Sequence, residues 1–167
     1  LSLPQVGYDL FDFEKWELVG DPQFILGGQH IEVVPRYGGI GTAPEGIRGV
    51  IGKAGKGFFI TDIESGQVKA LFTIAPYGKA IASYEARTHQ PAIPSFSVGM
   101  QDVPLLERYA ADRAPAWIKA QGRGTPHTGG KNIVGKLPGK RKEEIVIVAH
   151  ADTVYNTEGA NDNTASV

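Results

Sequence analysis

Three side chains in the last part of the sequence have the types and the spacing that suit a metal site. His150 follows an apolar run at 145–149, Asp152 comes two positions later, and Asp162 lies within Gly-Ala-Asn-Asp-Asn. Residues at i and i+2 of an extended chain project to the same side, so His150 and Asp152 leave the run together. An imidazole and two carboxylates that converge on one edge suit a divalent cation, zinc above all.

The element that must position these side chains is the run at 145–149. It is short, rich in β-branched residues and without alternation, which predicts a strand buried on both faces. Ligands of open α/β sheets gather just beyond the carboxyl ends of such strands. Taken singly, His150 reads as an ordinary hydrogen-bonded residue and Asp162 as turn or N-cap chemistry. Their conjunction favours a metal site.

The motif HADTV, followed by GANDN, resembles the di-zinc exopeptidases of the aminopeptidase Y and glutamate carboxypeptidase II type. The resemblance implies that His150 is a terminal zinc ligand and that Asp162 bridges two zinc ions. Asp152 would take part in catalysis by orienting the His150 ring. The implied activity is that of an aminopeptidase-like exopeptidase, which hydrolyses peptide bonds with a metal-activated water.

The resemblance begins near residue 132 and is incomplete. The Glu that serves as general base in this family, and the remaining zinc ligands, are expected beyond Val167. We therefore expect the chain to be an N-terminal fragment of a longer enzyme, inactive alone. An aminoacylase-like zinc hydrolase also carries an H-x-D-x-V motif and stays open as an alternative, although the nearby GANDN favours the first family.

The chain before residue 128 predicts a β-rich body with many turns, because glycine is abundant and proline fairly common. Residues 24–35 predict two short strands around Gly27 and Gly28, with His30 in a structural role. The further expectations are turns between short strands at 36–57, strands at 58–63 and 68–74, a helix at 77–87, a Pro94-containing edge strand at 92–98 and a helix after Asp102 that ends before Pro115.

The segment PAIPSFSVGMQDVPLLERY at 91–109 resembles the return of a protease-associated domain to its peptidase. The fold class is then α+β or α/β: a protease-associated-like domain followed by the first strands of an incomplete α/β zinc-exopeptidase sheet. The expected division is a lead-in segment at 1–20, the β-rich domain at 21–127 and the truncated peptidase part at 128–167. The alternative is a non-catalytic binding or interaction module.

Two stretches complete these expectations. The lead-in segment contains Tyr8, Phe11, Phe13 and Trp16, which we expect to pack on a neighbouring domain. A strand at 117–120 is expected to run into a polar connector at 121–131, with His127 as a surface loop residue. Residues 132–137 and 144–149 predict a hairpin that delivers His150.

Composition excludes several classes of function. The chain has 167 residues, a formal net charge of −1 and no cysteine, so it lacks a basic nucleic-acid surface and thiolate zinc ligands. No apolar run is long enough to span a membrane. The expected partners are a peptide substrate and either the missing C-terminal part of the enzyme or a second copy in a homo-oligomer. By resemblance, the location is secreted or extracytoplasmic.

Overall fold

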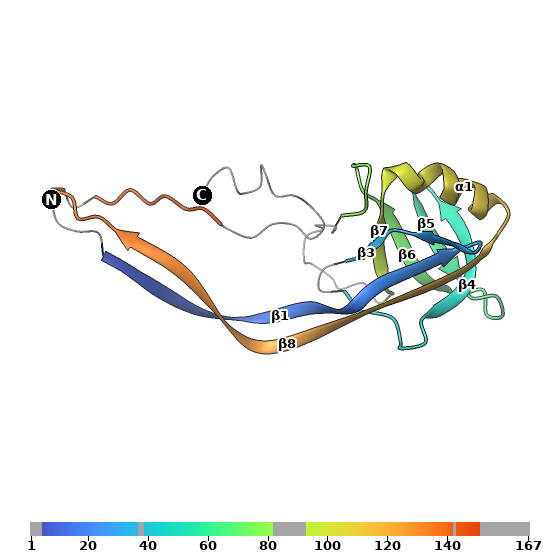
Figure 1. Ribbon diagram of the computed structural model, residues 1–167, viewed down its shortest axis with the longest axis horizontal. Coiled ribbons are helices and arrows are strands. Elements are labelled where there is room, and N and C mark those ends of the chain that lie inside the picture. The colour runs from blue at the N-terminus through green and yellow to red at the C-terminus, as the bar shows by residue number, and fades with distance from the viewer. Residues whose placement is uncertain (1–4, 37–38, 82–92, 142, 151–167) are drawn as a thin grey trace.

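Most of the chain belongs to one β-sheet. The computed structural model describes residues 5–36, 39–81, 93–141 and 143–150. Within them, eight strands lie in the order β2-β1-β8-β4-β5-β6-β7-β3 (Figure 1). The strands are β1 (Gln5–Leu26), β2 (Gln29–Ile31), β3 (Val33–Pro35), β4 (Ile47–Ala54), β5 (Gly57–Thr61), β6 (Val68–Ile74), β7 (Ser95–Val98) and β8 (Pro115–Lys136). A 3-10 turn, η1 (Met100–Asp102), precedes the helix α1 (Val103–Ala111).

The compact end of the molecule is a curled sheet. Strands β2 and β3 are the two edges of the strand order, yet only Glu32 separates them in the sequence. The two edges must therefore lie near one another, so the sheet curls round on itself. This curvature encloses a hydrophobic core on the inner face of the sheet.

Alternating residues fill that core, as the period of two of a strand requires. Phe24 and Phe72 are fully buried and stack with ring centroids 4.7 Å apart, and Phe96 lies 5.5 Å from Phe72. Helix α1 contributes the buried Leu106. The ring of Tyr109 lies over Gly27, a position with φ of 55° where a side chain would collide with the ring. Glycine is thus needed there for both the turn and the packing.

A long two-stranded ribbon extends from the compact end (Figure 1). Strands β1 and β8 pair antiparallel from Leu26 opposite Ala116 out to Gln5 opposite Lys136. The expected polar connector at 121–131 is wrong, because these residues continue β8. Its glycines are compatible with a strand because aromatic rings from β1 cover them: Trp16 lies over Gly122, and Phe11 lies over Gly130.

The strands expected at 24–35, 58–63 and 68–74 are confirmed, and residues 36–57 hold β4 as well as turns. Residues 77–81 are not helical, and the rest of the helix expected at 77–87 lies outside the described residues. The edge position expected for 92–98 is wrong, because β7 lies between β6 and β3. Pro94 comes just before β7, so its missing N–H removes no bond from the ladder.

The helix expected after Asp102 is confirmed as α1, with Asp102 at the N-cap position. The fold is therefore a sheet-rich mixed α and β fold with little helix. Strands β1 and β8 run through the boundaries that we place at residues 20 and 127, and the division into domains stays a prediction. In the described part of the chain, no helix is long and apolar enough to cross a membrane.

Candidate metal centre

The segment that leads to His150 starts at the far end of β8. After Lys136 the described residues have no regular secondary structure. Lys136 Nζ donates a hydrogen bond to Glu144 Oε1 at 2.8 Å. This contact holds the pKa of Glu144 below its usual value and raises the pKa of Lys136. This hydrogen bond connects the tip of the ribbon to the residue just before the apolar run.

The apolar run itself differs from the expectation. Residues 145–149 do not form a strand, and the expected hairpin with 132–137 is absent from the described residues. Ile145 and Ile147 are 92% and 90% exposed. A strand is stabilised by a ladder partner and by packing on its faces, and nothing in the described structure supplies either to this run. Residues 132–136 pair with β1 instead, with Asn132 opposite Asp9.

His150 is the one expected metal ligand that the structure describes, and it lies exposed at the end of this run. Asp152 and Asp162 lie outside the described residues, so their distances from His150 stay untested. Among the residues the structure does describe, no three His, Asp or Glu side chains form a group that could hold a metal ion. An imidazole is a ligand type that zinc prefers, so the donor that is present fits the expected metal.

Sequence reasoning missed the strand that accompanies this segment. The first half of β1 reads Gln-Val-Gly-Tyr-Asp-Leu-Phe, in which Val6, Tyr8 and Leu10 alternate with other residues. Such alternation predicts a half-buried strand. We interpreted the aromatic residues here as a packing cluster, which did not reveal that they face β8.

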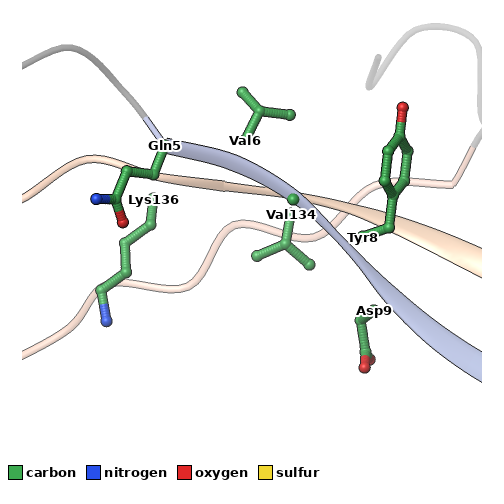
Figure 2. Close-up of a pocket in the computed structure, with 7 residues that line it drawn as sticks. Gln5, Val6, Tyr8, Asp9, Val134 and Lys136 are labelled. Carbon is green, nitrogen blue, oxygen red and sulfur yellow. The ribbon is translucent and has the colours of Figure 1, made fainter.

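A groove at the tip of the ribbon is open to solvent (Figure 2). It is lined by Gln5, Val6, Gly7, Tyr8, Asp9, Val134 and Lys136. The two side chains Val6 and Tyr8 point to one side of the ribbon, while Asp9 and Val134 point to the other. Lys136, its one cationic group, is already paired with Glu144.

His127 lies on the surface, as expected, but in a strand and not in a loop. An extra residue in β8 shifts the register between Phe13 and Lys15, and His127 adopts a φ of 54° at this bulge. Its Nδ1 is 2.8 Å from Asp12 Oδ2. Both side chains are exposed, so this pair contributes little to stability, and a single carboxylate partner does not make a metal site. His30 lies exposed in β2, and its structural role stays a prediction.

A second charged cluster stabilises the middle of the ribbon. Lys15 Nζ is 2.6 Å from Glu17 Oε2, and Arg123 Nε donates to Glu17 Oε1 at 3.0 Å from across the ladder. The hydrogen bonds from Lys15 and then Arg123 lower the pKa of Glu17 to about 2. The Arg123–Glu17 pair links the two strands across the ladder.

One partly buried carboxylate lies away from the ribbon. Asp102 Oδ2 has no hydrogen-bond partner, and burial, followed by the nearby charge of Glu32, raises the pKa of Asp102. Glu32 accepts a hydrogen bond from the Ala80 N–H at 3.3 Å. Two acidic groups without a third donor do not make a metal site, so the candidate centre remains the region around His150.

Comparison with known proteins finds a family match over that region. Residues 132–167, which include His150, Asp152 and Asp162, match the sequence model of Peptidase family M28. No curated protein sequence matches the chain. The match covers the end of β8, the apolar run and the whole candidate motif.

Two solved structures share the fold. One is a Peptidase M28 precursor from Shewanella amazonensis SB2B, with a TM-score of 0.54, 13% identity and coverage of 77% of this chain. The other is BSAP, a zinc aminopeptidase from Bacillus subtilis, with a TM-score of 0.57, 16% identity and coverage of 83% of this chain. The chain spans 40% of the first structure and 38% of the second.

Proposed function

We propose that the chain is the N-terminal part of a zinc-dependent exopeptidase that removes single residues from peptides. The observation that carries the proposal is the family match over residues 132–167, because it contains all three expected site residues. The fold shared with BSAP, a zinc aminopeptidase, supports the same general class of enzyme. Two zinc ions in each complete site follow from the type of motif.

In this proposal the residues of the chain divide the work. His150 would hold zinc through a ring nitrogen, and Asp162 would hold it through its carboxylate. Asp152 accepts a hydrogen bond from the other ring nitrogen of His150, which fixes its tautomer and raises its basicity. Zinc, when bound, polarises the scissile carbonyl and activates water for attack. A general base and further ligands come from polypeptide beyond Val167.

The curled sheet and α1 would act as a protease-associated-type domain beside the site. Its role would be to limit which peptides reach the metals, and the ribbon of β1 and β8 would connect it to them. This arrangement needs no nucleic acid or membrane span, and the partner that completes the site is the rest of the same polypeptide. An extracytoplasmic location is part of the proposal.

The test is the activity of the encoded protein continued past Val167. We expect bound zinc by elemental analysis and release of amino acids from aminoacyl anilides, both lost on treatment with a chelator. His150→Ala should remove both, while His127→Ala, which changes the bulge histidine, should leave them intact. The 167-residue chain alone should show neither.

The same preparation separates the alternatives. A folded protein that binds no zinc would favour a binding or interaction module. Cleavage of N-acyl amino acids, without cleavage of aminoacyl anilides, would favour an aminoacylase-like zinc hydrolase. Either result would replace the exopeptidase proposal.

A further inference from the structure

The outer half of the ribbon has one strongly apolar face, which we call the arm face: Val6, Tyr8, Leu10 and Ile133. The β1 residues alternate along the strand, and Ile133 lies directly opposite Tyr8 in the ladder. Lys131, opposite Leu10, shares the face, since its Nζ lies 5.8 Å from the centroid of the Tyr8 ring. Figure 2 shows Val6 and Tyr8 on the same side of the ribbon.

The arm face is uncovered in the described structure. Val6 is 68% exposed, Tyr8 67%, Leu10 71% and Ile133 76%. A two-stranded ribbon is marginally stable in water unless a third layer packs on it. An exposed apolar patch of this kind marks a surface that binds a protein, a membrane or a ligand.

We propose that the arm face packs against the body of a peptidase unit on the same polypeptide, so that the first half of β1 is structurally part of that unit. This inference rests on the proposed function and goes beyond it. It assigns an anchoring role to residues that lie far upstream of the family-matched segment. It also identifies the surface that sets the orientation of the curled sheet relative to His150.

Two observations identify the occupant. The match to Peptidase family M28 begins at residue 132, so Ile133 of the arm face already lies within the peptidase segment. The two structures that share the fold contain more polypeptide outside the matched part than within it. A peptidase body would therefore meet the ribbon where the arm face lies, with an apolar surface for Tyr8 and Leu10 and an acceptor for Lys131.

A second copy of the chain fits this face less well. Packing of two arm faces would bring two Lys131 ammonium groups into one interface. Asp12, the next β1 position on that side, is already paired with His127. Burial of a cation without a partner is costly, which disfavours this occupant.

The test compares Leu10→Asp with Ile63→Asp, a matched control in the loop between β5 and β6. The two side chains are 71% and 72% exposed in this chain. In the 167-residue chain, neither variant should change the rate of proteolysis in the ribbon. In the protein continued past Val167, Leu10→Asp should speed that cleavage about tenfold or more, because it places a charge in a buried interface, and Ile63→Asp should not.

If Leu10→Asp fails to fold, the milder variants Tyr8→Ser and Tyr77→Ser replace the first pair. In the longer protein, Tyr8→Ser should speed proteolysis in the ribbon and Tyr77→Ser should not. Equal effects of Leu10→Asp and Ile63→Asp in the longer protein would overturn the proposal, as would a reading frame that ends at Val167. Dimerisation of the 167-residue chain that Leu10→Asp abolishes would assign the face to a second copy. Loss of the exopeptidase proposal alone would appear as an inactive, zinc-free protein in which the Leu10→Asp effect persists.

Discussion

Tyr8 lies directly opposite Ile133 in the antiparallel ladder between β1 and β8. This pairing joins the first described strand to the segment that matches Peptidase family M28. The first half of β1 therefore lies beside the last part of β8, the strand that precedes His150 in the sequence. The elements from β2 to α1 lie between β1 and β8 in the sequence. The chain therefore enters the curled sheet along β1 and leaves it along β8.

His150 and the residue that orients it, Asp152, should differ in their effect on zinc binding. In the protein continued past Val167, Asp152→Asn should weaken zinc binding by about 10- to 100-fold, because it removes the group that orients the His150 ring. His150→Ala should weaken binding further, since it removes a ligand outright. Competition with a chromophoric chelator measures both. Equal affinity in Asp152→Asn and wild type would contradict the orienting role.

The aromatic core should dominate the stability of the compact end. Phe72→Ala should lower the free energy of unfolding by about 3–5 kcal/mol, because it leaves a cavity beside Phe24. Leu71→Ala is the matched control, since Leu71 is the adjacent β6 residue and is 37% exposed. Urea denaturation followed by tryptophan fluorescence gives both values. A similar loss in the two variants would show that Phe72 does not lie in the main core.

Gly49 in β4 is a position where even a methyl group should be costly. A Cβ there would lie 2.7 Å from Ile60 Cγ2 and would collide with the Thr61 carbonyl oxygen, which is backbone and cannot turn away. Gly49→Ala should therefore destabilise the protein by about 1–3 kcal/mol. Gly7→Ala, in the open part of β1, should be nearly neutral. Thermal unfolding of the two variants tests the contrast, and an unchanged midpoint for Gly49→Ala would refute the packing of β4 on β5.

The cluster around Glu17 should make the ribbon sensitive to acid. The pKa of Glu17 is lowered to about 2 by Lys15 and Arg123, from a usual value of 4.5. A lowered carboxyl pKa means that the stabilisation is complete above pH 4.5 and is lost as the pH falls towards 2. The effect should be small, because solvent screens exposed pairs. NMR titration of the Glu17 carboxyl measures its pKa. Glu17→Gln should remove the acid-dependent part of the stability, and Glu64→Gln serves as a control for removal of an exposed charge.

Asp102 should oppose folding at neutral pH. Burial and the charge of Glu32 raise the pKa of Asp102, so the folded state holds its proton more tightly than the unfolded state does. The associated stability is present below pH 3.8 and is lost as the pH rises through the folded-state pKa. Asp102→Asn should thus be neutral or stabilising at pH 7 and should flatten the acid side of the stability profile. A marked destabilisation at pH 7 would contradict a net cost of the partly buried Asp102 carboxylate, which keeps a hydrogen bond with Gln101.

Local sequence patterns were sufficient to predict several strands and the helix of the compact end. Alternation and turn residues predicted the strands around Gly27 and Gly28, the strands β5 and β6, and the helix that follows Asp102. Local patterns were insufficient for residues 121–131, whose glycines predicted a connector. Those glycines are strand positions because the rings of Phe11 and Trp16, from distant parts of the sequence, lie over them.

By itself, the sequence determined the chemistry that this protein offers: an imidazole at 150 and carboxylates at 152 and 162, in a spacing typical of one class of metal site. That information is local, since it depends on residue types and short spacings. Only the tertiary structure decided that β1 pairs with β8, that Tyr8 meets Ile133 and that the sheet curls so that β2 and β3 lie near one another. Strand pairing uses backbone hydrogen bonds that every residue type except proline can make, so a short local pattern does not by itself specify which distant strands become neighbours.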